Sequence, residues 1–463
     1  MDLAGRLRRW WGVRADAWRT RLWPIPVAGV ALAAVLGVVL PRLDARLDDE
    51  LPPWMTAYLF TGGPEAARTV LSAIAGSLIT VTSLTFSLTV VTLQLASSQY
   101  SPRLLRTFVQ DRFVHVALAL LLATFVYSLT VLRTVRASAE DRSAFVPQLS
   151  VTVAYLLALA GVIALVAFLA HLARQIRVES LLRVVHAEAD ATIARNLPEE
   201  DGGEDEGTTV PSGVPPMRTD QTVPLCARSS GFLTSVDEEE LLAAAVDAGA
   251  VVLLRHFPGD SVVAGIPIAA ARPLDEGAAL DPETVGALSG RVAEAVGTGY
   301  ERTAAQDVAF GLRQIVDVAL KALSPGINDP TTAVHALGHV AALVCDLARR
   351  DLGPRLLRDD SGRVRVVLRR PGFPMLLDLA ITQPRRYGTG DPEVLARLFT
   401  MLREVAWSTH RPEHHRAVAD QLVRLCTTAD TQGYDREEAA RMGALARSVR
   451  EALAGRWPPD AGF

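Results

Sequence analysis

One stretch of the chain combines apolar character with many hydrogen-bonding side chains. TVTSLTFSLTVVTLQLASSQYSPR, residues 80 to 103, has a hydroxyl or amide at almost every second or third position, and its first charge is Arg103. On a helix, each residue advances by 100°, so these side chains fall into rows. The first row comprises Gly76, Thr80, Ser83, Ser87, Val91, Gln94 and Ser98. The second row, well around the helix, comprises Thr82, Thr85, Thr89, Thr92 and Gln99.

The two rows have two interpretations. Small and hydroxylated residues let membrane helices approach closely, and Ser or Thr can bond the carbonyl four residues back, which indicates helix packing. Uncharged hydroxyls and amides can also solvate a passing ion without trapping it, which indicates a wall of a water-filled path. The second interpretation requires a homo-oligomer, because four helices in one chain are too few to enclose a path. The pore-lining or helix-packing candidates are Thr80, Ser83, Ser87, Gln94 and Ser98.

A second candidate site lies between residues 302 and 332. We expect a helix from about Arg302 to Leu323, on which five polar residues share one face. SPGINDPTT then ends this helix, and Asp329 caps the next one with Pro330 in its first turn. The segment is either a capped helical hairpin with exposed ion pairs, or a site where helix-start amides bind an anionic ligand or lipid headgroup. Its candidate ligand-binding residues are Arg302, Gln306, Arg313, Asp317, Lys321, Asn328 and Thr331.

Two rare residue types fall in that segment, and common enzyme and metal-binding motifs do not occur in the sequence. Lys321 is the only lysine and Asn328 is one of two asparagines. The chain has no Walker A, GxSxG or GxGxxG motif, and its three cysteines form no CxxC pair, so we expect no enzyme and no cofactor. His335 and His339 are four residues apart without an intervening Glu, and no metal site is predicted. We expect His414 and His415 to be exposed residues of a helix.

Four apolar segments must position the first candidate site. Each is about long enough to cross a bilayer, and none contains Asp, Glu, Lys or Arg, which argues against a proton-coupled carrier or a voltage sensor. They are Leu22 to Leu40, Thr69 to Ser101, Phe113 to Leu132 and Ala144 to Ala170. Arginines in the short flanking segments predict that both termini are cytoplasmic, in a multi-pass protein of the bacterial inner membrane.

Beyond residue 172 charges recur every few residues, which indicates a soluble region. Residues 171 to 195 are expected to continue as a basic amphipathic helix, and the acidic Gly/Pro-rich segment after them indicates a flexible linker. VRVVLRR and FPMLLDLAIT are expected to form a strand pair flanked by helices. The helices predicted after it run from Asp391 to Thr409, Pro412 to Thr428 and Arg436 to Leu453. The net charge of −4 argues against nucleic acid as a partner. The predicted parts are a basic tail at 1–21, four spans at 22–172, a juxtamembrane helix and linker at 173–217, a small β-rich module at 218–275 and a helix-rich α/β domain at 276–463.

Three segments resemble a known family. LASSQYSPRLLRTFVQDR (95–112), LATFVYSLTVLRTVR (122–136) and QDVAFGLRQIVDVALKALSPGINDPTTAVHAL (306–337) are similar to the predicted bacterial membrane proteins catalogued as domain of unknown function 2254. The resemblance extends from about residue 20 to 410. It implies a membrane domain joined to a soluble one, and it implies no activity.

These observations predict an α-helical membrane domain with four transmembrane helices and a mixed α/β (α+β) cytoplasmic domain. The expected function is a homo-oligomeric ion channel or pore in the lipid bilayer, lined by the second span and regulated by the cytoplasmic domain. The alternative is a non-conducting sensor or scaffold whose cytoplasmic domain binds an anionic small ligand, a lipid headgroup or a partner protein.

Overall fold

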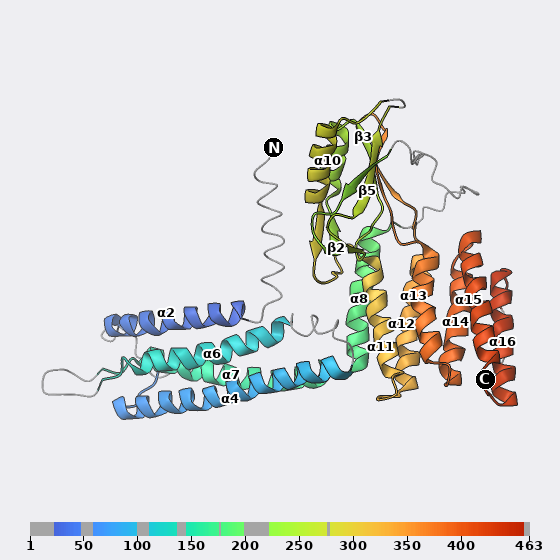
Figure 1. Ribbon diagram of the computed structural model, residues 1–463. Helices are drawn as coiled ribbons and strands as arrows, with labels where there is room; N and C mark the ends of the chain where they lie inside the picture. The colour runs from blue at the N-terminus through green and yellow to red at the C-terminus, as the bar shows by residue number, and fades with distance from the viewer. Residues whose placement is uncertain are drawn as a thin grey trace. The chain divides into compact units, whose positions relative to one another are not determined.

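The computed structural model describes residues 23–47, 59–99, 111–136, 145–175, 177–198, 222–275 and 278–457. The chain divides into two compact units, Met1–Ser180 and Leu181–Phe463. The predicted basic tail and the acidic linker segment lie outside the described residues. Figure 1 shows the long helices of the first unit in blue to green and the mixed second unit in green to red.

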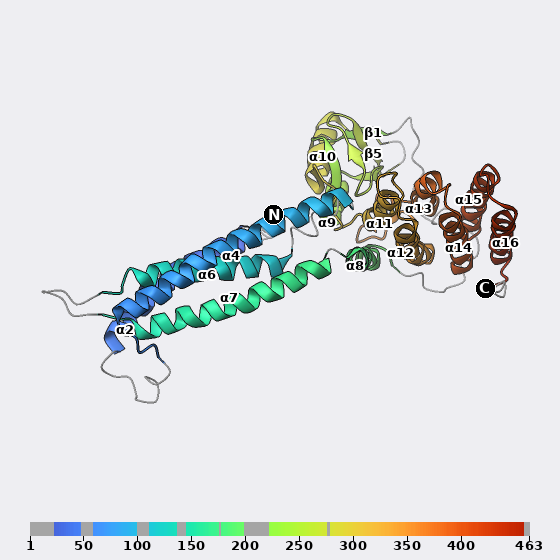
Figure 2. The ribbon, with the colours of Figure 1, turned by 90° about the horizontal axis from the view of Figure 1, so that it is seen from below.

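The described part of the first unit consists of four long helices. They are α2 (Pro24–Leu47), α4 (Pro64–Gln99), α6 (Arg112–Leu132) and α7 (Gln148–Gln175). Each contains most of one of the apolar segments predicted from the sequence, although α7 begins at Gln148 rather than at Ala144. In α6 the residues packed against α2, α4 and α7 include Tyr127 and Val131, both fully buried. Figure 2 shows these helices running alongside one another.

Five helices in the described residues are long and apolar enough to cross a membrane, where the sequence predicted four. Four are those of the first unit, and the fifth is α12 (Pro330–Ala348). The apolar composition of α12 has a second explanation, because α12 packs between α11 (Val308–Ala322) and α14 (Pro392–Ser408) inside the second unit. Length and composition alone therefore do not fix the number of spans.

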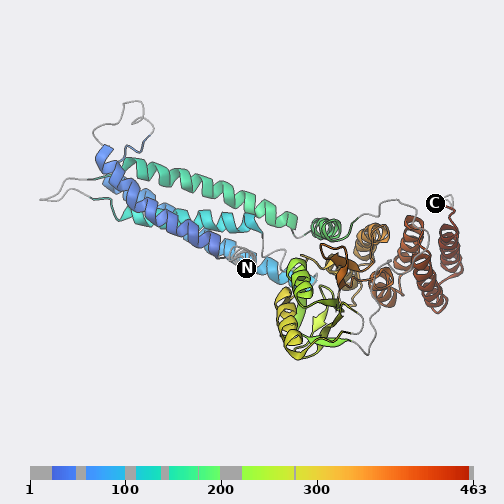
Figure 3. The same cartoon turned by 90° about the horizontal axis from the view of Figure 1, so that it is seen from above.

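Two sheets form the β part of the second unit. The larger has the order β1 (Val223–Cys226), β5 (Pro267–Pro273), β3 (Ala250–Leu254), β8 (Val364–Leu368), β7 (Arg355–Arg358), in which only β3 and β8 pair in parallel among the described strands. The smaller has the order β4 (Ser261–Val262), β2 (Gly231–Val236), β6 (Val296–Gly299). Helices α9 (Glu238–Asp247) and α10 (Pro282–Ala295) pack on them, as Figure 3 shows.

The boundary predicted between residues 275 and 276 does not separate two domains. Strand β3 is almost wholly buried, so it needs a neighbour on each edge; β5 is one, and β8, about 110 residues later in the chain, is the other. Strand β6 likewise pairs with β2. The predicted β-rich module is therefore completed by strands from the C-terminal part of the chain.

The helical part of the second unit comprises α8 (Val178–Asn196), α11, α12, α13 (Phe373–Tyr387), α14, α15 (Pro412–Asp430) and α16 (Arg436–Leu453). The predictions for α14, α15 and α16 are confirmed within two residues. The strand predicted for FPMLLDLAIT was wrong: this segment begins α13, whose buried residues recur at helical spacing. The continuous helix predicted from 171 to 195 is instead the end of α7 followed by α8, which starts at Val178.

Candidate functional site

The two polar rows of α4 differ in exposure. Members of the second row are buried within the unit: Thr82, Thr85, Thr89 and Thr92. Members of the first row are exposed in the single chain: Gly76, Thr80, Ser83, Ser87, Val91 and Gln94. The side chains of Ser98 and Gln99 lie outside the described residues. Helix α4 packs against α6 and α7, so the second row faces the helices of its own chain and the first row faces away from them.

Hydroxyl groups in both rows donate hydrogen bonds to the backbone of α4 itself. In the first row, Thr80 Oγ1 donates to the Gly76 carbonyl at 3.1 Å and Ser83 Oγ to the Ile79 carbonyl at 2.9 Å. In the second row, Thr85 Oγ1 donates to the Val81 carbonyl at 2.8 Å. These hydroxyl protons are therefore satisfied without water, while the oxygen lone pairs remain able to accept a hydrogen bond or contact a cation.

Apolar side chains border the first row. Leu84 is 58% exposed and Phe86 is 57% exposed, one on each side of the row. The outer face of α4 is therefore a polar strip between two apolar flanks.

Sequence analysis missed a buried carboxylate that joins α2 to α7. Asp44 of α2 is 7% exposed and accepts hydrogen bonds from Leu149 N at 3.1 Å, Ser150 N at 2.9 Å and Ser150 Oγ at 2.6 Å. It thereby caps the start of α7, where the preceding Pro147 has no side-chain oxygen for this role. The absence of a capping side chain before QLSV was the signal in the sequence that could have indicated such a partner.

The predicted ligand-binding residues near α11 separate into two groups. Helix α11 begins at Val308, so the expectation that it starts at Arg302 was wrong. Arg302 and Gln306 precede the helix, whereas Lys321 lies in its last turn. The helix has 15 residues, so its ends are about 22 Å apart at 1.5 Å per residue. One small ligand does not contact both groups.

The residues before α11 hold the local fold together. Arg302 Nε lies 2.7 Å from Asp307 Oδ2, and Asp307 caps α11 through Ala309 N. Burial raises the pKa of the Asp307 carboxyl, and the Arg302 guanidinium opposes that effect. Gln306 binds both backbone groups of Val236, accepting from its N–H at 2.7 Å and donating to its carbonyl at 3.2 Å.

The residues after α11 form the predicted helical hairpin. Asp329 Oδ1 accepts from Thr332 N at 3.0 Å, and Pro330 occupies the first turn of α12, which confirms the predicted cap. Asn328 has a φ of 49° and is exposed, as is Thr331. Arg313, Asp317 and Lys321 are half-buried along α11. The capped hairpin is therefore present, while these three residues of α11 are half-buried where exposed ion pairs were expected.

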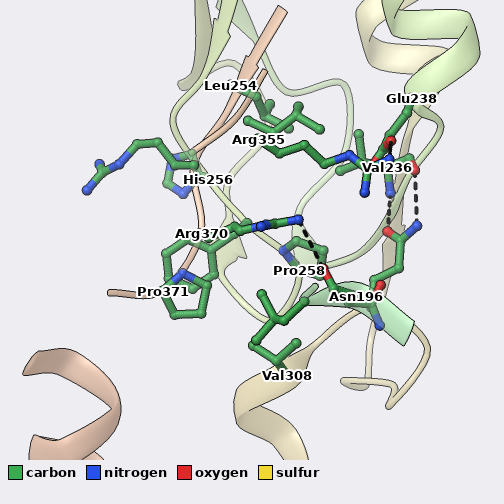
Figure 4. Close-up of a pocket in the computed structure, with 15 residues that line it drawn as sticks. Asn196, Val236, Glu238, Leu254, His256, Pro258, Val308, Arg355, Arg370 and Pro371 are labelled. Atoms are coloured by element: carbon green, nitrogen blue, oxygen red, sulfur yellow. Dashed lines mark hydrogen bonds and ion pairs between the residues drawn. The ribbon is translucent and has the colours of Figure 1, made fainter. Parts of the chain in front are cut away.

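A pocket of the second unit opens beside Gln306, the one predicted ligand residue that lines it. Its empty volume, which is open to solvent, is about 590 Å³. Figure 4 shows Arg355 and Arg370 extending into it, with Val308 and Pro371 on its walls. Arg369 and His256 also line it. The sequence predicts VRVVLRR as a strand, and it carries no local signal that the final two arginines line a pocket.

Two of these arginines have defined partners. Arg355 Nη2 lies 2.6 Å from Glu238 Oε2. Arg370 donates to the backbone carbonyls of Asn196, at 3.0 Å, and Asp351, at 3.3 Å. Burial lowers the pKa of Arg370, and the attraction of the Asp351 carboxylate offsets this only in part. Arg370 is therefore a partly buried cation that contacts neutral carbonyl groups.

Histidines cluster without forming a recognised metal site. The ring of His339 lies 5.5 Å from that of His335 and 5.0 Å from that of His186 on α8, between centroids. No group of three or more His, Cys, Asp or Glu that could hold a metal ion is found in the described ranges.

His414 was expected to be exposed, but it is only 2% exposed. Its ring stacks on that of Phe373, with ring centroids 4.0 Å apart.

Long apolar helices with exposed apolar side chains, joined to a charged α/β and helical unit, define an integral membrane protein. A family model described as "Predicted membrane protein (DUF2254)" matches residues 19–404, so the chain belongs to this family. It is 36% identical over 433 residues to an uncharacterized protein of Mycobacterium tuberculosis strain H37Rv and to one of Mycobacterium bovis. These alignments cover 92% of this chain and 80% of each relative. No solved structure matches the chain.

Proposed function

We propose that α2, α4, α6 and α7 cross the bacterial plasma membrane with both termini in the cytoplasm, and that the protein is a homo-oligomeric ion channel lined by α4. The observation that carries this proposal is the exposure of the first row, from Gly76 to Gln94, on a helix whose second row is already buried. The role requires no catalysis. The second unit acts as a cytoplasmic regulatory domain.

The physical argument rests on what the first row can contact. A glutamine side chain in hydrocarbon leaves an amide without hydrogen bonds, which costs several kcal/mol in the absence of a partner. Gln94 is exposed in the single chain, so either water or another copy of the chain must contact it to avoid this cost. A ring of copies with α4 innermost provides both, since the hydroxyl oxygens of Ser83 and Ser87 then face a shared aqueous path.

A second candidate function is a non-conducting sensor or scaffold. Its support is the set of bonds from hydroxyls to the backbone of α4, exemplified by Thr80 and Ser83. Hydroxyls satisfied in this way can pack helix against helix without water. In that case the first row joins copies of the chain, and the second unit carries the function by binding an anionic ligand or a partner protein.

Recordings from purified protein in planar bilayers separate the two candidates. The channel proposal predicts discrete currents, with a changed unit conductance or ion preference in Gln94→Leu and Ser87→Ala. Phe86→Leu, on the apolar flank, is the matched control and leaves the currents unchanged. Silence from a folded, oligomeric preparation contradicts the channel proposal. Variants that change only the stability of the oligomer assign the first row to packing.

A further inference from the structure

The pocket of the second unit lies where the parallel strands of the larger sheet end. Strands β3 and β8 pair in register through Leu254 and Leu368, so their carboxyl ends meet at the same edge. The residues that directly follow are Arg255-His256 and Arg369-Arg370, and three of these four line the pocket. Binding residues are often carried on loops that a rigid sheet positions. These strand ends place three pocket residues in that way.

Charge in this pocket is unbalanced. Arg355, Arg369 and Arg370 line it, whereas Glu238 supplies the one carboxylate among its described lining residues. Glu238 is already paired with Arg355. The nearby Asp351 carboxylate accepts a hydrogen bond from Gly353 N within its own turn, and Arg370 bonds the Asp351 carbonyl instead. The lining arginines therefore exceed the lining carboxylate by two charges.

The contacts of Arg370 leave donors available for a ligand. Its two hydrogen bonds go to carbonyls, one of them at the C-terminal end of α8, where a cation is favourable. A guanidinium has five N–H donors in a planar fork, and that fork matches the oxygen atoms of a phosphate or carboxylate. The direct hydrogen bonds of Arg370 go only to carbonyl oxygens, so an anion that joins this partly buried cation gains a charge-assisted contact. Arg369, exposed at the rim, adds a second fork.

The remaining walls of the pocket are apolar. Leu254 is buried, and Val236, Val308 and Phe257 also line the pocket. Ligand sites commonly combine apolar walls with a few polar groups. This pocket has both and opens to solvent, so an organic moiety can lie against its walls while an anionic group meets the arginines.

We propose that this pocket binds a small soluble organic phosphate, with Arg370 and Arg369 holding the phosphate and the apolar walls holding its organic part. A phosphate monoester carries about −1.5 to −2 charges at pH 7 and three acceptor oxygens, so it can contact two arginines, which a single carboxylate does less well. The proposal stands apart from ion conduction, since it concerns only the second unit. It also differs from the site predicted near Lys321 and Thr331, which lies at the other end of α11.

Thermal unfolding and calorimetric titration of the purified full-length protein test this site. The probes are AMP, ribose 5-phosphate and glycerol 3-phosphate, each compared with adenosine, ribose or glycerol. We expect saturable binding and a raised Tm with at least one phosphate and with none of the compounds that lack it. Unchanged unfolding with all three phosphates overturns the proposal. Equal binding of a phosphate and its dephosphorylated counterpart also overturns it.

Arginine variants locate the bound phosphate. Arg370→Gln removes a charge-assisted contact and should weaken binding roughly tenfold or more. Arg369→Gln, at the exposed rim, should weaken binding about threefold to tenfold while leaving the Tm of the unliganded protein unchanged, which keeps the test valid if Arg370→Gln fails to fold. Arg416→Gln, exposed on α15, is the matched control. Wild-type affinity in Arg369→Gln and in any folded Arg370→Gln protein contradicts the assignment. Phosphate binding does not depend on ion conduction, so this test gives its result whether or not the protein conducts current.

Discussion

The two units of this chain differ in which side chains they expose and which they bury. In the first unit, Leu84 and Phe86 are more than half exposed, whereas Thr85 between them is completely buried. In the second unit, the buried face of α11 is apolar, with Leu312 and Ile315 fully buried. Exposed apolar surface of the first kind is stable only against lipid or another protein. Exposure separates α4, whose apolar window is 22% buried, from α12, at 50%, but it does not separate α12 from α6, at 56%.

The units satisfy buried polar groups partly in the same way. In both, hydroxyls bond the carbonyl four residues back on their own helix, as in Thr85 with Val81 and Thr400 with Ala396. The second unit also uses buried ion pairs, such as Arg365 with Asp359, whose nearest atoms lie 2.7 Å apart. In the first unit the buried Asp44 joins two helices through three hydrogen bonds, so it provides the sharpest test of what holds that unit together.

The largest expected effect on stability comes from Asp44→Ala. The substitution removes three hydrogen bonds between α2 and α7, two of which involve backbone N–H groups at a helix start. Hydrogen bonds to charged groups contribute about 1.5 to 3 kcal/mol each, and three that share one carboxylate should fall at the low end, so we expect a loss of about 4.5 kcal/mol in the free energy of unfolding of the first unit. Denaturant titration in detergent measures it. Glu65→Ala, at an exposed acid of α4, is the control, and an equal loss in both variants would sink this account of Asp44.

The second unit should lose stability in acid through His414. Burial lowers the pKa of His414 from its ordinary 6.5 to about 4, so the unfolded chain takes up a proton that the folded protein does not. Stability therefore falls as the pH drops from about 6.5 to about 4, by about 3 kcal/mol in full at about 1.4 kcal/mol per pKa unit.

Unfolding at several pH values between 4.5 and 7 measures this slope. His414→Gln should flatten it, whatever the substitution does to stability at neutral pH. His410→Gln, at an exposed histidine, should leave the slope as in the wild type. A slope that is the same in His414→Gln and the wild type would assign the acid sensitivity to other groups.

Substitutions in the two rows of α4 should have different, and smaller, effects on the free energy of unfolding. Thr85→Leu places extra volume in a completely buried position, and overpacking of this kind costs about 1 to 3 kcal/mol. Ser83→Leu adds the same type of side chain to the exposed row and should change the free energy of unfolding of the single chain by less than about 0.5 kcal/mol. Denaturant titration of dilute, dissociated protein compares them. Similar losses in both variants would show that the rows do not differ in burial.

The sequence predicted those features that depend on local pattern. The four apolar helices, the hairpin capped by Asp329 and helices α14 to α16 follow from composition, capping residues and helical spacing. The two rows of α4 could be predicted as rows, but the assignment of the second row to the interior depends on where α6 and α7 pack. The pairing of β3 with β8 joins residues more than 100 positions apart, and no local signal predicts it.

The same limit explains what was missed at the candidate sites. Arg369 and Arg370 acquire their position only because β8 lies parallel to β3, so the pocket could not be inferred from VRVVLRR alone. FPMLLDLAIT was misread because a short apolar run fits a strand as well as a helix, and the Pro374 that follows Phe373 suits the first turn of a helix. The set from Arg302 to Thr331 does not form one site because the 15 residues of α11 hold its two groups about 22 Å apart.

The most direct test of the central claim is the accessibility of α4 to water. In a background where Cys226, Cys345 and Cys426 are replaced by alanine, Ser87→Cys on the first row and Phe86→Cys on the apolar flank are exposed to a charged, membrane-impermeant thiol reagent in intact vesicles. A water-filled path predicts rapid labelling of Ser87→Cys and slow labelling of Phe86→Cys. Equal protection of both, in oligomeric protein, would contradict a path lined by the first row and favour its role in packing.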